Sequence, residues 1–311
     1  MQYRDLGSTG LRVSVMSMGA ASFASDSSEA GAEECVCATH CAIDQGINFF
    51  DVSPFYGETV CEERLGKALL GRRDEVFLAT KCGRYGGVEF DFSAKRVARS
   101  TDESLARLNT DYLDLLQAHD IEFGDLDQIV EETLPAMREL QEAGKCRFIG
   151  ITGYPLHVLR QVAERHQVDT ILSYCRYNLL ITDMDDVLTP FCRDRGIGLI
   201  NASPLHMRLL TDTGAPDWHP APEEVKQAGQ RAAELCRAAG ANISDVAMRF
   251  CLDHPYVATV LVGMSKQRHV ERNLAAMQFQ PDPELMAAVR EALAPVQNVT
   301  WPYGWDEPGL E

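Results

Sequence analysis

The sequence is short of basic residues: 29 lysines and arginines stand against 46 aspartates and glutamates, so the formal net charge at pH 7 is −17. A protein with this charge repels phosphodiester backbones and anionic lipid headgroups. The charge therefore argues against nucleic acid or a membrane surface as a partner. It does not identify a substrate.

Long apolar runs are also missing. No run approaches the roughly 20 residues that a helix needs to cross a bilayer, and the first ten residues, MQYRDLGSTG, lack the basic and apolar regions of an export signal. Ten cysteines without such a signal are typical of reduced thiols. We therefore expect a cytoplasmic protein, and no feature of the sequence decides between a monomer and a small homo-oligomer.

A convincing metal site is absent as well. The segment ECVCATHC brings Cys35, Cys37, His40 and Cys41 close in sequence, but zinc needs four ligands that converge at bond distance. The segment is predicted to be helical, and a step of two residues turns a helix by about 200°. Cys35 and Cys37 should therefore face apart, and no metal is expected.

The glycine-rich fingerprint of a doubly wound dinucleotide-binding sheet does not occur, because GRYGG at 83–87 has the wrong spacing. Instead, apolar runs alternate with amphipathic helical patterns such as 93–108 and 126–144. The runs lie at 13–19, 47–51, 76–80, 112–119, 147–152, 170–174, 198–203 and 257–263. Eight strands, each followed by a helix, predict one (β/α)8 barrel (TIM barrel) domain over residues 1–311.

Two segments depart from a bare barrel. The short runs around GSTG, residues 3–14, predict an N-terminal β-hairpin that closes the bottom of the barrel. Residues 204–222 form a long loop that contains Pro, Trp and His. Loops of that length in compact domains are usually functional or mobile.

Polar residues follow three successive predicted strands. Asp51 ends the second run, with Tyr56 in its loop, Lys81 follows the third, and His119 ends the fourth. Active sites of such barrels lie at the carboxyl ends of the strands. Singly, each residue has a structural interpretation: a cap, a packed ring, a solvated charge or a hydrogen-bonded histidine. Together, on neighbouring strands, they predict a catalytic site.

These side chains suit proton transfer at a carbonyl or alcohol oxygen. A lysine close to a tyrosine stabilises phenolate and should lower the tyrosine pKa from its usual value near 10, while Asp51 would orient Lys81. The accompanying hydride requires a cofactor, since no side chain carries one. A Schiff-base role for Lys81 is the competing interpretation, but a neighbouring aspartate would keep the lysine charged.

With these four residues the sequence resembles the aldo-keto reductase superfamily, whose signature places Asp and Tyr after the second strand and Lys and His after the next two. The segments GINFFDVSPFYG, SPLHMRLLT and VLVGMSKQRHVERNLAA extend the resemblance over essentially the whole chain. ATKCGRYGGVEFDFSAKRV, RFIGITGYPL and VTWPYGWDEP are similar to a subgroup of aldose 1-dehydrogenases. The resemblance implies that Tyr56 is the general acid or base, that Asp51 and Lys81 tune it, and that His119 orients the substrate.

The resemblance also implies a nicotinamide cofactor, NAD rather than NADP. Met264 and His269 stand where NADP-preferring relatives typically carry Lys and Arg, although Lys266 and Arg268 lie nearby and either could substitute. The implied cofactor-binding residues are Gly19, Ala20, Asp51, Thr152, Ser173, Ser203, Pro204, Leu205, Gly263, Met264, Ser265, His269 and Asn273.

For the substrate, a small sugar, the candidates are loop residues whose side chains can contact hydroxyls or C–H faces: Tyr85, Asp120, Trp218 and Trp305, with His219 and Trp301 beside them. The reaction that the resemblance implies is oxidation of a cyclic aldose, with L-galactose foremost, at C1 to the lactone. L-Fucose or D-threo-aldose oxidation and general aldehyde reduction are alternatives. A barrel that binds the cofactor chiefly as a sensor or subunit is the alternative from another class.

Overall fold

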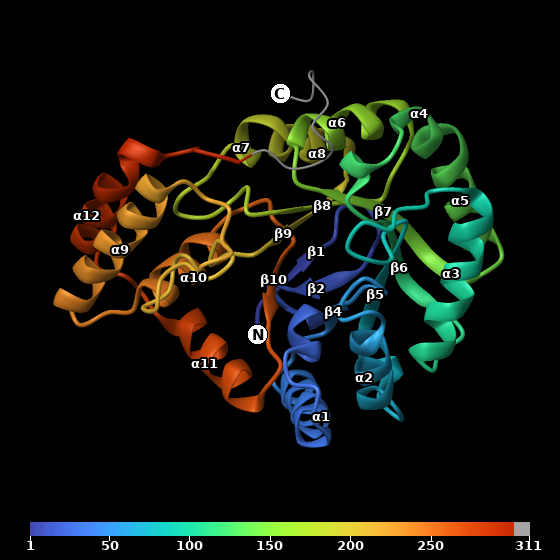
Figure 1. Cartoon of the computed structure of the whole chain (residues 1–311), viewed down its shortest axis with the longest axis horizontal. Coiled ribbons are helices and arrows are strands. Elements are labelled where there is room, and N and C mark those ends of the chain that lie inside the picture. Colours follow the sequence, from blue (N-terminus) through green and yellow to red (C-terminus); the bar gives the residue numbers. More distant parts are fainter. Residues whose placement is uncertain (302–311) are drawn as a thin grey trace.

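Eight parallel strands form a closed barrel in the spatial order β10-β3-β4-β5-β6-β7-β8-β9. The computed structural model describes residues 1–301, and Figure 1 shows the strands surrounded by helices. The strands are β1 Tyr3–Asp5, β2 Arg12–Ser14, β3 Met16–Gly19, β4 Phe49–Asp51, β5 Phe77–Cys82, β6 Leu113–Ala118, β7 Cys146–Gly153, β8 Thr170–Tyr174, β9 Gly198–Ala202 and β10 Thr259–Gly263. The predicted (β/α)8 barrel is confirmed.

Helices follow every barrel strand. They are α1 Glu29–Asp44, α2 Val60–Ala68, α3 Ala94–Arg107, α4 Leu126–Gln128, α5 Leu134–Glu142, α6 Leu156–Arg165, α7 Met184–Val187, α8 Thr189–Arg195, α9 Glu223–Ala238, α10 Ile243–Leu252, α11 Gln267–Gln278 and α12 Pro283–Leu293. Helices α9 and α12 pack on each other at one edge of the molecule (Figure 1).

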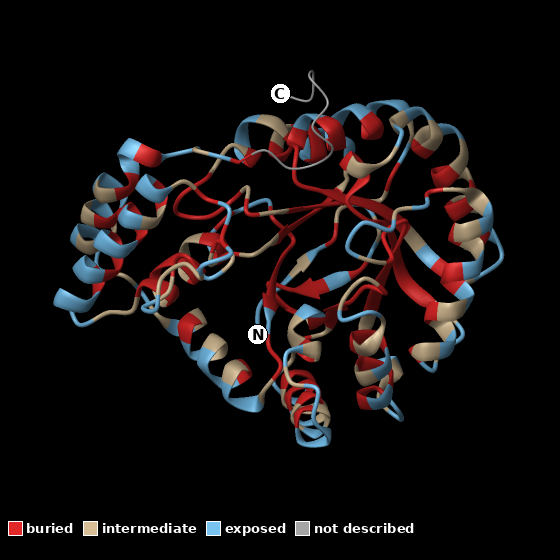
Figure 2. Ribbon diagram, viewed as in Figure 1, coloured by how far each residue is buried: buried red, intermediate tan, exposed pale blue. Residues whose placement is uncertain are grey.

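The strands are apolar on consecutive positions because both of their faces are covered. In β4, Phe49 packs with residues of the barrel interior, whereas Phe50 packs in the layer between the strands and the helices. Figure 2 shows the barrel strands as mostly buried, with exposed residues on the outer faces of the helices. The carboxyl ends of the strands are therefore held in fixed relative positions by two apolar layers.

The N-terminal hairpin closes one end of the barrel, as predicted. Strands β1 and β2 pair antiparallel, and Leu6, Leu11 and Val13 pack in the same apolar cluster as Phe49 of the barrel interior. Gly7 has a φ of +56°, and a Cβ there would lie 2.3 Å from the backbone nitrogen of Gly198. Because Gly198 begins β9, the hairpin seals the end opposite the predicted active site.

The helical pattern predicted for residues 126–144 contains a π-helical turn at Ile129–Thr133 between α4 and α5. Pro135 lies in the first turn of α5. Proline has no N–H to donate to the carbonyl four residues earlier, and its ring crowds that carbonyl. The regular α-helical pattern of hydrogen bonds is therefore replaced by the π-helical turn just before Pro135.

The cysteines are not paired. All ten lie within residues 1–301 and none is in a disulfide. On α1, Cys35 is buried and Cys37 is exposed, so the two thiols point in different directions. Among the described residues, no three His, Cys, Asp or Glu side chains are grouped so that they could hold a metal ion. In the same part of the chain, no helix is long and apolar enough to cross a membrane.

Candidate active site

A buried ion pair lies where β4 and β5 end. Lys81 Nζ donates to Asp51 Oδ1 and to the carbonyl of Val52, the latter at 2.9 Å. Gln117, from β6, donates from Nε2 to the other Asp51 oxygen at 2.9 Å. All three residues are at most 2 % exposed. Both carboxylate oxygens of Asp51 are thus satisfied by donors from the next two strands, as a buried charge requires.

Tyr56 and His119 complete the predicted set. The Tyr56 ring centroid lies 4.9 Å from Lys81 Nζ, and the Tyr56 and His119 rings meet edge to face with centroids 5.6 Å apart. The turn that carries Tyr56 closes with its backbone N–H donating to the Ser53 carbonyl at 3.1 Å. The structure therefore brings the four sequence-predicted side chains together at one rim.

The pKa of Tyr56 departs from the sequence-based expectation. Burial raises this pKa well above its usual range, and the carboxylates of Asp51 and Asp120 raise it further. The expected lowering by Lys81 is wrong for the structure as described, because the lysine charge is already paired with Asp51. Tyr56 is therefore a neutral phenol at pH 7.

His119 is also uncharged at neutral pH. Burial lowers its pKa well below the usual range, and the positive charges of Lys81 and Arg84 lower it further. Its Nδ1 lies 3.0 Å from the hydroxyl of Ser53. The neutral imidazole can therefore donate one hydrogen bond and accept another.

A cavity of about 900 Å³ begins at Asp51 and Tyr56 and extends over the ends of β9 and β10 to α11. This volume is at the upper end of the range of ~300–1,000 Å³ typical of small-molecule sites. The predicted cofactor residues that line it are Gly19, Asp51, Ser203, Pro204, Leu205, Gly263, Ser265, His269 and Asn273. The long loop after β9, including Trp218, forms one wall.

That wall fits a pyrophosphate. Ser203 has a φ of 58°, and the consecutive residues His206, Met207 and Arg208 have φ values of 49°, 48° and 78°. Successive left-handed residues can form a backbone concavity that binds anions, and here the His206 N–H closes the turn by donating to the Ser203 carbonyl at 2.9 Å. Arg208 lines the same cavity and adds a positive charge. The donor set therefore suits the phosphates of a dinucleotide.

The sequence profile of the Aldo/keto reductase family matches residues 15–294. The chain belongs to this family. It is similar to L-galactose dehydrogenase of Arabidopsis thaliana, with 46 % identity over 98 % of each chain, and to D-arabinose 1-dehydrogenase of Saccharomyces cerevisiae, with 33 % identity over 68 % of this chain and 66 % of the other. The solved aldo-keto reductase AKR11C1 of Bacillus halodurans (holo form) superposes with a TM-score of 0.81 at 26 % identity, covering 99 % of this chain and 100 % of the other.

As an aldo/keto reductase the chain is an oxidoreductase that uses a nicotinamide cofactor. Four of the residues expected to bind this cofactor do not line the cavity. Ala20 and Met264 are fully buried in the apolar core. Thr152 accepts a hydrogen bond at 3.1 Å from the backbone N–H of Asp120, and Ser173 donates to the carbonyl of Gly153 at 3.1 Å. The Thr152 and Ser173 side chains thus hold the ends of β7 and β8 in place.

Several lining residues were missed by sequence reasoning: Ser22, Ser25, Arg208, Ser244, Met248 and Arg272. Ser22 and Ser25 belong to the loop after β3, for which no chemistry was assigned. Arg272 is one helical turn beyond His269 and adjacent to Asn273, both of which line the cavity. Helical spacing from His269 could have found it.

Two of the substrate candidates lie near the four-residue set or the cavity. Asp120 follows His119, forms an ion pair with Arg84, and its Oδ2 lies 3.8 Å from His119 Nε2. Trp218 lines the cavity and is 64 % exposed. Trp305 lies outside the described residues.

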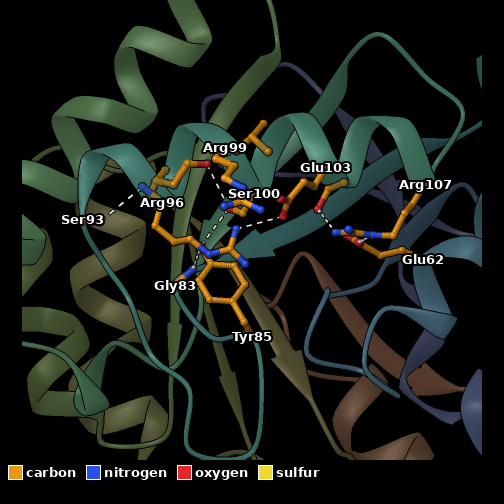
Figure 3. A network of polar contacts seen from close by, with 12 residues as sticks. Glu62, Gly83, Tyr85, Ser93, Arg96, Arg99, Ser100, Glu103 and Arg107 are labelled. Atoms are coloured by element: carbon orange, nitrogen blue, oxygen red, sulfur yellow. Dashed lines mark hydrogen bonds and ion pairs between the residues drawn. The ribbon is translucent and has the colours of Figure 1, made fainter.

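Tyr85, a third substrate candidate, is held by contacts within its own loop and with helix α3. Its hydroxyl donates to Ser100 at 2.9 Å and accepts from the backbone N–H of Gly83 at 3.0 Å. The Arg96 guanidinium lies 3.7 Å from the centre of its ring. Figure 3 shows the ring held against helix α3 by this network. Tyr85 therefore anchors the loop after β5 and does not line the cavity.

His219 and Trp301 are packing residues behind the cavity wall. Trp301 is 6 % exposed and stacks on Tyr154, with ring centroids 5.1 Å apart. The Nε2 of His219 lies 2.9 Å from the carbonyl of His206. Both residues stabilise the loop after β9 instead of lining the cavity.

The buried ion pair generates a stability prediction. The substitution Lys81→Met leaves Asp51 buried without its cation, and breaking such a pair typically costs about 3–5 kcal/mol of unfolding free energy. In the double variant Lys81→Met with Asp51→Asn the uncompensated charge is gone, so we expect at least about half of that loss to be recovered. Urea unfolding of the three proteins measures both changes. Equal stability of the single and double variants would contradict the assignment of the cost to Asp51.

Proposed function

We propose that this aldo/keto reductase is an NAD-linked aldose 1-dehydrogenase that oxidises ring-form L-galactose at C1 to the lactone. The observation that carries the proposal is the convergence of Asp51, Tyr56, Lys81 and His119 at one rim of the barrel, where Asp51 and Tyr56 line the cavity. The A. thaliana relative of this chain carries the name L-galactose dehydrogenase. We place this activity in the cytoplasm, where ten unpaired cysteines are stable.

Each side chain has a distinct part in the proposed reaction. A nicotinamide held by the residues that line the cavity would supply the acceptor for the hydride of C1. In its phenolate form, which Lys81 close to the face of its ring stabilises, Tyr56 removes the proton of the anomeric hydroxyl and becomes the neutral phenol. Asp51 holds the ammonium in place, and His119 donates a hydrogen bond to the substrate oxygen. Burial and the carboxylates of Asp51 and Asp120 oppose ionisation of Tyr56, so the share of phenolate grows as the pH rises.

Preference for NAD is supported by the ion pairs of two cations, Lys266 and Arg268, in the segment expected to bind the adenosine half of the cofactor. Lys266 Nζ lies 2.5 Å from Glu34 Oε2, and Arg268 Nη1 lies 3.8 Å from Glu34 Oε1. Neither of these cations lines the cavity, whereas Arg272 does. Glu34 thus neutralises the two side chains that could otherwise replace the missing Lys and Arg at a 2′-phosphate.

The main test is a steady-state assay of aldose oxidation. Wild-type enzyme should reduce NAD with L-galactose more efficiently than with D-sugars. The variant Tyr56→Phe should lose at least about 100-fold in kcat, because general base catalysis contributes on the order of 10²–10⁴-fold, while its Kd for NAD from fluorescence titration stays unchanged. Absence of NAD reduction with L-galactose, L-fucose and related L-sugars would refute the proposed substrate class.

The rate of oxidation should rise with pH. A base with a raised pKa is mostly protonated at pH 7, so its active form grows about tenfold per pH unit below the pKa. The His119 pKa is lowered well below its usual range, so this residue does not titrate between pH 6 and 9. We expect kcat/KM for L-galactose to increase across that interval until another step limits the rate. A flat profile would show that Tyr56 ionisation does not control the reaction.

Cofactor choice should respond to Glu34. The substitution Glu34→Gln releases Lys266 and Arg268 from their partner, and partly exposed pairs of this kind contribute about 0.2–1 kcal/mol each. We expect kcat/KM for NADP to rise about two- to fivefold, with that for NAD unchanged. The control Glu33→Gln removes the same charge at a neighbouring exposed position. An equal rise in kcat/KM for NADP in both variants would show that the change in net charge alone causes the effect.

A further inference from the structure

Ser53 makes a buried contact with the catalytic histidine that the reaction as described does not use. It lies two residues after Asp51 in the turn that carries Tyr56, and it is fully buried. Its Oγ accepts a hydrogen bond from the backbone N–H of Phe55 at 3.1 Å. The same atom lies 3.0 Å from His119 Nδ1.

The number of available protons decides whether Ser53 or His119 is the donor in this hydrogen bond. A serine hydroxyl has one proton to donate, and within residues 1–301 the His119 ring is its sole hydrogen-bond acceptor. If Nδ1 carried the ring proton, the Ser53 proton would be buried without an acceptor, which costs about 1–3 kcal/mol. Ser53 therefore donates to Nδ1, and a neutral ring must then carry its proton on Nε2.

The Nε2–H group is kept free for another acceptor. In the described part of the chain this atom makes no hydrogen bond, and the nearest carboxylate oxygen, Asp120 Oδ2, is 3.8 Å away. Asp120 is held by Arg84, whose guanidinium lies 3.7 Å from the centre of the Phe55 ring. Phe55 thus contributes to both arrangements. Its backbone N–H donates to Ser53, and its ring contacts the guanidinium of Arg84, which pairs with Asp120.

We propose that Ser53 is a positioning residue that holds His119 in the Nε2–H tautomer, so that this N–H is the donor to the oxygen on which charge develops during oxidation. A donor aimed at such an oxygen stabilises the transition state more than the ground state. The opposite tautomer would present a lone pair to that oxygen. The role of the donor rests on the proposed function, whereas the tautomer itself does not.

The tautomer can be read directly from the full-length wild-type protein. Histidine is labelled with ¹⁵N, the His119 signals are identified by their loss in His119→Asn, and two-bond ¹⁵N–¹H correlations distinguish the two ring nitrogens. We expect an unprotonated, hydrogen-bonded Nδ1 and a protonated Nε2 at pH 7. A protonated Nδ1 would overturn the proposal. This measurement needs no cofactor or substrate, and it stands even if no aldose is oxidised.

Variants at Ser53 test the consequence for the reaction. Ser53→Ala removes the donor, so the Nδ1 resonance should move and kcat for L-galactose should fall roughly five- to tenfold, as expected for the loss of one hydrogen bond, with the Kd for NAD unchanged. Ser53→Thr keeps a hydroxyl and should restore both the resonance and kcat. A Ser53→Ala protein with wild-type ¹⁵N shifts and wild-type kcat would refute the positioning role.

Discussion

The buried pairing of Lys81 with Asp51 is the interaction on which the rest of the site depends. Two charges that are at most 2 % exposed remain ionised inside a protein only when each has partners that replace water. Asp51 obtains them from Lys81 and Gln117, and Lys81 also from the Val52 carbonyl. These contacts tie together the ends of β4, β5 and β6. Tyr56 and His119 therefore lie beside an ion pair whose position is fixed by three strands.

Much of this arrangement was predictable because a parallel barrel converts sequence position into spatial position. Residues that end consecutive strands must meet at one rim, so Asp51, Lys81 and His119 could be grouped without coordinates. Gln117 lies two residues before His119 on the same face of β6, and period-two spacing would have pointed to it. Its significance appears only in the contact with Asp51.

Other features depend on packing that the sequence does not encode locally. The side chain of Tyr85 is directed toward α3 by Ser100 and Arg96. Both residues belong to a helix that comes later in the chain, so the sequence around Tyr85 does not reveal this orientation. Met264 stands in the expected cofactor segment, but its side chain packs inward. The sequence predicts a lowered pKa for Tyr56, whereas burial raises it. Neighbouring charges can be inferred from the sequence, but the burial of the ring cannot.

The N-terminal hairpin closes the end of the barrel that lies opposite the candidate catalytic residues. Leu6, Leu11 and Val13 fill one end of the barrel, while the candidate catalytic side chains and the cavity occupy the other. The loop after β9 combines packing with cavity lining, because Leu209 and Leu210 lie buried in a second apolar cluster while Trp218 lines the cavity. A substitution at either buried leucine would therefore change the shape of the cavity and the packing of the domain together.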